Sequence, residues 1–400
     1  ARKQILTGLY ASRTGVWSNG LVVPLGDDDD SDDDSERNFG HFMQAAGYAT
    51  AVAGKWHVPK TTLPSEPNAG FDEYCLWESQ GELNKLPGAL QHEGAWEDAD
   101  TTSRYWHPCI VRNHELVETA SNDFGPDIFT DFLCDFMERS ISDNKPFLAY
   151  YPMVAPHGTR EGHTTCPLYG EVGDMAGERD DLGPRFRALI NYMDILIGRL
   201  QEKVRTLGVE ENTIFIFCAD NGTAVTAKSR GVERGCRVPF IACGAGIENR
   251  GVTDEICDLS DILPTLVDLA DAGNPEEYAS DGVSLKPFLT GQSDSHRDYI
   301  FACIGGTRLV RSRTHMLEVV CPILDVPEGR FYFYGDSYDG RGYVRAENDP
   351  AHADVRVEFE RILDSHPGLD FNQPYFQRGS GLRWLDAYSD PAMAEKHLHK

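Results

Sequence analysis

The feature of this chain that most constrains its fold is an alternation of strand-sized apolar runs with longer amphipathic segments through its first two thirds. The clearest run, 213–219, is continuously apolar, which is typical of a strand in a sheet covered on both faces. The clearest helix spans about 184–207, because its apolar residues recur at helical spacing between Pro184 and Gly208. The alternation predicts an α/β fold in which a large, mostly parallel sheet is sandwiched by helices.

Other segments continue this alternation and then change in character. We expect strands at 48–54, 146–151 and 238–243, a helix ending near Gly47, and helices at 127–142 and 259–269. Residues 70–122 have weak periodicity and predict a long excursion of surface loops. After Gly291, short strands precede one helix near 355–363, which indicates a small α+β domain. We therefore divide the chain into an α/β domain at 1–294 and a C-terminal domain at 295–400.

The charge of the chain limits its partners. The formal net charge is -27, and only seven of the 64 acidic residues lie in the run at 27–34. A chain this negative repels nucleic acid and anionic membranes, so we expect no nucleic-acid partner. The acidic run lacks EF-hand spacing and its turn glycine, which favours a solvated loop over a calcium site.

Two further classes of protein are disfavoured by the sequence. No stretch approaches the roughly 18 apolar residues that a membrane helix needs, so no membrane span is expected. The ten cysteines form no CxxC pair and no zinc spacing, and several lie in apolar runs. We interpret them as buried small side chains, with room for one or two disulfides, and the redox compartment stays open.

Polar residues follow three of the expected strands. Lys55 and His57 end the first, His157 follows the second, and Asp220 and Asn221 follow the third. Each is ordinary by itself, because such histidines are often structural and Asn-Gly is often a turn. The carboxyl ends of parallel strands meet at one edge of a sheet, however, so we expect these residues to converge.

Together these residues fit the transfer of a sulfuryl or phosphoryl group. Asp220 and Asn221 offer the carboxylate and amide oxygens that a hard cation such as Ca²⁺ prefers. The histidines, Lys55 and Lys228 offer proton transfer and positive charge to a tetrahedral anion. A metal, lysine and histidine around one anion suit either reaction.

The chain resembles the formylglycine-dependent sulfatases of the alkaline phosphatase superfamily, and is arylsulfatase A-like. The resemblance extends over almost 300 residues in order. Residues 1–10 resemble the tail of the signature C-x-P-S-R-x-x-L-x-T-G, and Lys228 with 233–239 resembles K-x(4)-E-G-G-x-R-V-P. The other matching segments are AGYATAVAGKWH at 46–57, APH at 155–157, IFCADNG at 216–222, DLSDILPTL at 258–266 and DGVSLKPF at 281–288.

The resemblance implies an alkaline phosphatase-like fold and a role for each matching residue. Asp220 and Asn221 would be Ca²⁺ ligands, and Arg2 would support a formylglycine nucleophile. Lys55 and Lys228 would hold sulfate oxygens. His157 would give a proton to the departing alcohol as general acid, and His57 would help sulfate to leave as a base.

The sequence also departs from the family pattern. The nucleophile, a Cys or Ser oxidised to formylglycine, would lie upstream of Ala1, as would two further metal-binding aspartates. We therefore expect an N-terminally truncated piece, and a genuine start at Ala1 would predict no turnover. Arg234 replaces the first glycine of the E-G-G element.

The resemblance leaves the substrate open. A sulfated small molecule or saccharide is expected as the substrate. Because the chain is so acidic and a long polyanion would be repelled, we expect a short substrate or exo-action at the end of a saccharide chain. Specificity is expected from Arg160 and His163, as substrate-binding residues, and from the aromatic loops that contain Trp77, Trp96 and 105–107.

Several alternatives also stay open. One is a phosphoester or phosphonate hydrolase of the same superfamily, and another is a non-catalytic protein that binds sulfated glycans. The resemblance favours a periplasmic or extracellular location. Oligomeric state is not indicated.

Overall fold

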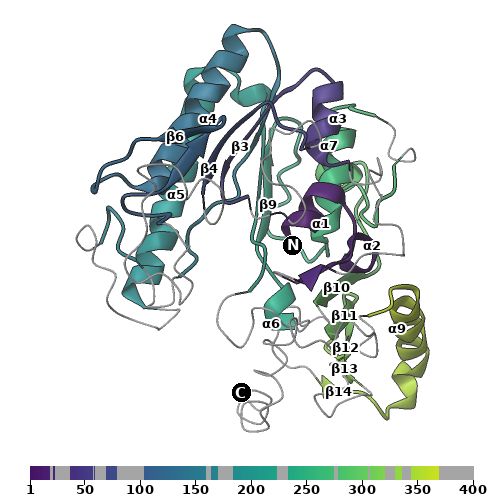
Figure 1. The fold of residues 1–400 in the computed structure, drawn as a ribbon. Coiled ribbons are helices and arrows are strands. Elements are labelled where there is room, and N and C mark those ends of the chain that lie inside the picture. The colour runs from purple at the N-terminus through teal and green to yellow at the C-terminus, as the bar shows by residue number, and fades with distance from the viewer. Residues whose placement is uncertain are drawn as a thin grey trace. The chain divides into compact units, whose positions relative to one another are not determined.

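The structure is a computed structural model that describes residues 1–18, 21–22, 37–56, 58, 69–78, 103–158, 164–169, 183–222, 233–273, 278–304, 307–319, 329–335 and 344–368. The chain forms two compact units. The first comprises Ala1–Glu36, Ile214–Leu269 and Asn274–Lys400, and the second comprises Arg37–Thr213 with Ala270–Gly273. Figure 1 traces both units from the purple N-terminus to the yellow C-terminal helix.

A five-stranded sheet forms the core of the second unit, in the order β6-β5-β4-β3-β7. Its strands are β3 (Ala49–Gly54), β4 (Glu73–Trp77), β5 (Ile110–Arg112), β6 (Glu115–Val117) and β7 (Phe147–Tyr150). Strand β3 runs parallel to β4 and β7, whereas β4–β5 and β5–β6 are antiparallel pairs. Residues 51–53 of β3 are small and fully buried, which lets helices approach this central strand closely.

Helices cover this sheet. They are α3 (Phe39–Ala45), α4 (Gly125–Ser142) and α5 (Pro184–Thr206), followed by the 3₁₀ turn η3 (Glu210–Asn212). Helix α4 packs on β3, β4 and β7, and α5 packs on α4 (Figure 1). In α4, Phe129, Leu133 and Phe136 recur on one helical face and are buried.

The first unit contains the two ends of the chain. Its helices and 3₁₀ turns are α1 (Arg2–Thr7), α2 (Ala11–Thr14), α6 (Glu233–Cys236), η4 (Leu259–Asp261), α7 (Ile262–Leu269), α8 (Lys286–Leu289), η7 (Pro350–His352) and α9 (Ala353–Ser365). Two antiparallel pairs, β1 (Val16–Ser18) with β2 (Leu21–Val22) and β8 (Ile214–Cys218) with β9 (Phe240–Gly244), accompany them. Helix α1 packs against η4 and α7.

The C-terminal part of this unit is an antiparallel meander covered by one helix. Its strands pair in chain order: β10 (Ile300–Ile304), β11 (Thr307–Arg311), β12 (His315–Val319), β13 (Arg330–Phe333) and β14 (Val344–Arg345). Helix α9 packs on β11 and β12, where Phe359 meets Phe331. The expected α+β texture is therefore present, while the boundary at residue 294 stays a prediction.

The predicted α/β class and most predicted elements are confirmed, with two differences. The segment 70–122 was expected to be surface loops, yet it contributes β4, β5 and β6 to the sheet, with Tyr74 and Ile110 fully buried. Its short strands carry too few residues for a clear period. The run at 213–219 forms β8, but each of its strand residues is only half-buried and its partner β9 is antiparallel.

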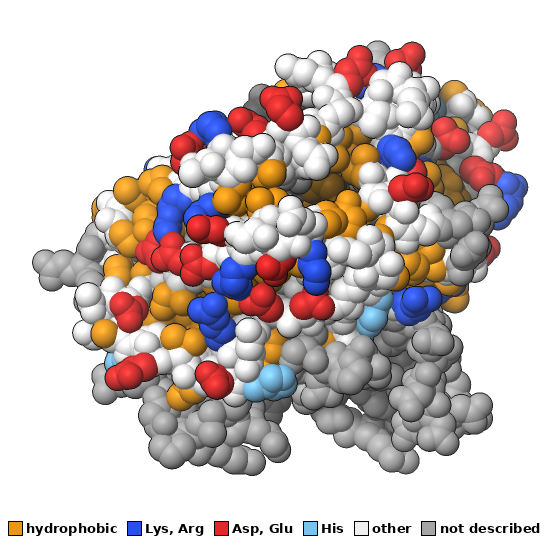
Figure 2. All heavy atoms as spheres, turned by 90° about the horizontal axis from the view of Figure 1, so that it is seen from above, with side chains coloured by type: hydrophobic (Ala, Val, Ile, Leu, Met, Phe, Trp, Pro, Cys, Tyr) orange, Lys and Arg blue, Asp and Glu red, His pale blue; other side chains and the backbone are white. Residues whose placement is uncertain are grey.

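The described surface mixes charges of both signs. Figure 2 shows acidic and basic side chains interspersed on one face. Between α4 and α5, Arg199 bonds Asp127 at 2.6 Å and Lys203 bonds Glu138 at 2.9 Å. Such exposed pairs add little stability. Across the described helices, none combines the length and the apolar character required to cross a bilayer.

Candidate functional site

Lys55 stands where β3 ends, beside the chain that follows β7. Its backbone N–H donates to the carbonyl of Pro152 at 2.8 Å. The preceding Gly54 has φ +112°, and a Cβ there would lie 2.4 Å from the same Pro152 oxygen. Only glycine permits both this conformation and this approach. The parallel pairing of β3 and β7 thus brings Lys55 next to the segment that carries His157.

His157 is held by the loop that follows β7. The Tyr105 hydroxyl lies within hydrogen-bond distance of two carbonyls of this loop, Val154 at 3.1 Å and His157 at 2.8 Å. The ring nitrogen Nδ1 of His157 lies 2.6 Å from the carbonyl oxygen of Gly158. The same nitrogen lies 3.1 Å from Nη2 of Arg104. The backbone and the ring of His157 are therefore both tied to fixed protein groups.

Arg104, which the sequence motifs did not point to, joins these residues. Its guanidinium is buried, stacks over the Trp77 ring at 4.8 Å and donates to the Gly158 carbonyl at 2.8 Å. The Nζ of Lys55 lies 5.6 Å from the same Trp77 ring. Burial lowers the pKa of Arg104. Two cations therefore face one indole, and the imidazole of His157 lies beside one of them, an arrangement suited to an anion.

The aromatic segment 105–107 uses its polar atoms within the protein. The indole Nε1 of Trp106 donates to Thr165, and His107 contacts the carbonyl of Thr119 at 3.1 Å. Trp77 is only 8% exposed, beneath its two cations. The described rings from which substrate specificity was expected therefore pack and form hydrogen bonds within the protein.

Asp220 and Asn221 follow β8 in the first unit. The turn is held at Gly222, whose N–H donates to Gly235 at 2.9 Å. Asp220 is exposed, and Nδ2 of Asn221 donates to the Gly222 carbonyl at 2.9 Å. That bond uses the amide nitrogen, so the carbonyl oxygen of the side chain is the atom suited to a cation.

The start of α1 lies near this turn. Arg2 and Asp220 both lie within electrostatic range of Ala1, the residue that precedes this helix. Arg2 and Asp220 are thus brought into one neighbourhood. Lys55 and His157 belong to the other unit.

The donor chemistry of the Asp220 turn fits a hard cation in part. Asp220 and Asn221 would supply two of the six to eight oxygens that Ca²⁺ takes. The described ranges contain no cluster of three or more His, Cys, Asp or Glu side chains that could hold a metal. The two donors fit the ion by type and form part of a coordination shell.

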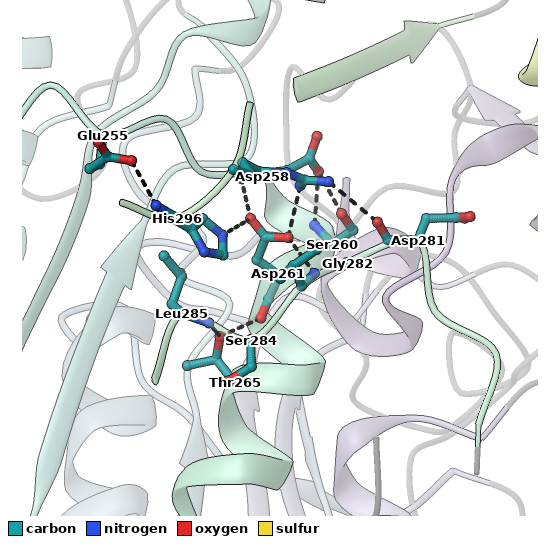
Figure 3. Close-up of polar contacts among 12 residues, drawn as sticks. Glu255, Asp258, Ser260, Asp261, Thr265, Asp281, Gly282, Ser284, Leu285 and His296 are labelled. Carbon is teal, nitrogen blue, oxygen red and sulfur yellow. Dashed lines mark hydrogen bonds and ion pairs between the residues drawn. The ribbon is translucent and has the colours of Figure 1, made fainter. Parts of the chain in front are cut away.

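A buried polar cluster underlies α1, and Figure 3 shows its centre at Asp261. This carboxylate is fully buried and accepts hydrogen bonds from Arg297 at 2.8 Å, from the ring of His296 at 2.9 Å and from the backbone of Asp258 at 2.7 Å. A buried carboxylate is stable only with such partners. His296 and Arg297 lie outside every matching motif, so sequence reasoning missed them.

The same cluster holds α1 and the segment that follows it. Gln4 on α1 donates to Asp258 at 2.6 Å, and the N–H of Tyr10 donates to Asp281 at 2.7 Å. Arg13 pairs with Asp281 at 3.0 Å. The segments DLSDILPTL and DGVSLKPF thus anchor the helix that begins with Arg2.

Five residues that the sequence analysis named lie outside the described residues. These are His57, Arg160, His163, Lys228 and Trp96, while the side chain of Arg234 in α6 is likewise not described. Their assigned roles stay predictions.

Comparisons with known proteins identify the family of this chain. The family model "Sulfatase" matches residues 1–272. Human arylsulfatase A is 30% identical over 333 residues, which cover 75% of this chain and 60% of that protein. The chain thus spans less than two thirds of this relative's length.

Two solved structures show the same fold. One, in complex with its substrate D-glucosamine-2-N,6-O-disulfate, has TM-score 0.63 and 18% identity, covering 99% of this chain and 89% of the other. A phosphonate monoester hydrolase from Silicibacter pomeroyi has TM-score 0.58 and 18% identity, covering 91% and 84%. At these identities the likeness concerns the fold alone. The family match over residues 1–272, more than half of the chain, shows that this chain belongs to the sulfatase family.

Proposed function

We propose that the full-length protein hydrolyses sulfate esters, with a sulfated saccharide as substrate. The observation that carries this proposal is that Lys55 and Arg104 face Trp77 within one unit and that His157 lies beside Arg104. Two fixed cations and one proton-transferring ring suit a tetrahedral anion whose ester oxygen must be protonated on departure. Family membership favours sulfate over other such anions.

Each of the described residues would have a distinct role in the reaction. The Lys55 ammonium would bind a sulfate oxygen, and His157 would give a proton to the alcohol oxygen as the S–O bond breaks. Arg2, at the start of α1, would place positive charge near the nucleophile. His57 and Lys228 complete this set by resemblance, as base and as a second sulfate-binding cation, and Arg160 and His163 would bind the rest of the substrate.

A metal and a modified residue belong to the same proposal. Asp220 and Asn221 would hold Ca²⁺, which when bound would polarise a sulfate oxygen. A formylglycine, formed from a Cys or Ser upstream of Ala1, would supply the nucleophile. A periplasmic or extracellular location is included because the family resemblance favours it.

A saccharide substrate is favoured by one neighbour of the same fold, whose substrate is a disulfated glucosamine. The interspersed surface charges suit a short or terminal sulfated unit better than a long polyanion (Figure 2). The second candidate, phosphonate or phosphoester hydrolysis, is kept because the fold also matches a phosphonate monoester hydrolase.

A paired assay of the full-length protein tests the proposal. Nitrophenyl sulfate, nitrophenyl phosphate and a phosphonate monoester are compared at equal concentration, together with a sulfated monosaccharide. Faster release from the sulfates supports the proposal, whereas faster release from phosphate or phosphonate selects the second candidate. Binding of the sulfated sugar without any release would indicate a non-catalytic glycan-binding protein.

A further inference from the structure

Arg104 is a buried cation whose contacts in the described part of the chain are with carbonyl, imidazole and aromatic groups. Nη2 donates to the Gly158 carbonyl, and the guanidinium faces the rings of Trp77 and Tyr105 at 4.8 and 5.6 Å. Burying a guanidinium without an opposite charge is costly, and aromatic faces offset only part of that cost. A cation kept in such a place invites a functional explanation.

The contacts of Gly158 decide where the His157 ring carries its proton. Nδ1 lies 2.6 Å from the Gly158 oxygen, a distance at which two lone pairs would repel but an N–H and an oxygen attract. Arg104 can only donate, and its Nη2 already donates to that oxygen. The Gly158 carbonyl therefore accepts from both Arg104 and Nδ1–H of His157, and Nε2 is the nitrogen that takes up and releases a proton.

We infer that Arg104 is a positioning residue for leaving-group protonation: it fixes the Gly158 carbonyl against Nδ1 of His157 and makes the protonated ring a stronger acid. The guanidinium lies 3.1 Å from Nδ1, so its charge disfavours the imidazolium. A carboxylate in that place would do the opposite and hold the proton on the ring. As the S–O bond to the alcohol breaks, the sulfuryl group passes to the nucleophile of the proposed function, the electron pair stays on the alcohol oxygen, and the Nε2 proton moves to that oxygen.

This inference rests on the proposed function, and it predicts a loss of rate that depends on the leaving group. An alcohol that leaves readily as an anion needs little protonation, whereas a poor leaving group needs much. Loss of Arg104 should therefore slow esters of poor leaving groups most. General damage to the fold would slow all esters alike.

The experiment compares kcat for nitrophenyl sulfate and phenyl sulfate in the full-length protein and its Arg104→Met and Arg104→Lys variants. We expect Arg104→Met to lower kcat at least about tenfold more for phenyl sulfate than for nitrophenyl sulfate. Lysine keeps the charge but lacks the planar fork, so Arg104→Lys should recover only part of the difference. A raised KM with unchanged kcat for both esters would overturn the inference and make Arg104 a substrate-binding residue.

A double-variant comparison and a matched control complete the test. If Arg104 acts through His157, Arg104→Met should change kcat less than about twofold when His157 is already alanine. An undiminished effect there would overturn the inference. The control is Arg112→Met, because Arg112 is an exposed arginine of the same unit whose guanidinium lies 5.0 Å from the Phe132 ring. It should leave the dependence on the leaving group unchanged.

A measurement on the unmutated protein covers the case in which Arg104→Met does not fold. Nitrogen-15 NMR of labelled histidines, with His157 assigned by difference from His157→Gln, should show the neutral Nδ1–H tautomer. A neutral Nε2–H tautomer would overturn the inference. If the unmutated protein releases no sulfate, the proposed function fails, while the tautomer still tests the arrangement of Arg104, Gly158 and His157.

Discussion

The side-chain amide of Gln4 donates a 2.6 Å hydrogen bond to the carboxylate of Asp258, a residue 254 positions further along the chain. This bond joins α1, which begins with Arg2, to the buried cluster around Asp261 (Figure 3). The helix is only six residues long and cannot be stable by itself. Its position therefore depends on the carboxylates beneath it.

Asp258 should make the first unit less stable as pH rises. Burial, together with the neighbouring Asp261 carboxylate, raises the pKa of Asp258 from 3.8 to about 6. The folded chain keeps this proton at pH values where the unfolded chain has lost it, so this group's contribution to the free energy of unfolding falls between about pH 4 and pH 6. Asp258→Asn should match the parent near pH 4 and exceed its stability by about 1 to 3 kcal/mol near pH 7.

Denaturant unfolding at several pH values measures this effect. The amide oxygen of the introduced asparagine could still accept from Gln4 and Ser260, so the hydrogen bonds are largely kept. Asp254→Asn, at an exposed position, is the control and should show no such dependence. A stability difference that is the same at every pH would contradict the prediction.

Gly54 should tolerate alanine much less well than Gly47. Both have positive φ, +112° and +87°, which costs a side chain about 1 to 3 kcal/mol. At Gly54 the new Cβ would also lie 2.4 Å from the Pro152 oxygen, whereas nothing lies within 4 Å at Gly47. Thermal unfolding of the two alanine variants should show the larger loss at 54. Equal losses would mean that the approach of β3 to the His157 loop is looser than the structure indicates.

Removal of the Asp220 carboxylate should weaken calcium binding by the full-length protein. We expect Asp220→Asn and Asn221→Ala to reduce Ca²⁺ affinity by at least about tenfold, because each removes one oxygen ligand or its charge. Isothermal titration measures the affinity, and a chelator should abolish sulfate release by the parent. Asp254→Asn serves again as the matched control. Unchanged Ca²⁺ affinity in both site variants would exclude this turn as the metal site.

Thiol reactivity should distinguish the cysteines by exposure. Burial raises the pKa of Cys75 and of Cys303 to about 12, so few of these thiols ionise near pH 8. Cys243 on β9 is exposed. Cys243→Ser should therefore remove one fast-reacting thiol per chain in a titration with a chromogenic disulfide, and Cys75→Ser should remove none. The reverse order would contradict the described burial.

Particular elements show how far sequence reasoning reached. The helix expected at 184–207 is α5 (Pro184–Thr206), and the strand expected at 213–219 is β8 (Ile214–Cys218). Both carry long periodic or continuous apolar patterns, which local sequence records directly. Strands β5 and β6, of three residues each, carry no such pattern and were missed.

In the candidate site, too, the sequence indicated some features and only the structure revealed others. The sequence by itself determined the α/β class, the family, and the placing of Lys55, His157, Asp220 and Asn221 just after their strands, because periodicity and motif spacing are local properties. Only the tertiary structure decided that Arg104 lies against His157 and that Gln4 bonds Asp258. Such contacts join residues 53 and 254 positions apart, and packing rather than sequence spacing selects which distant side chains meet.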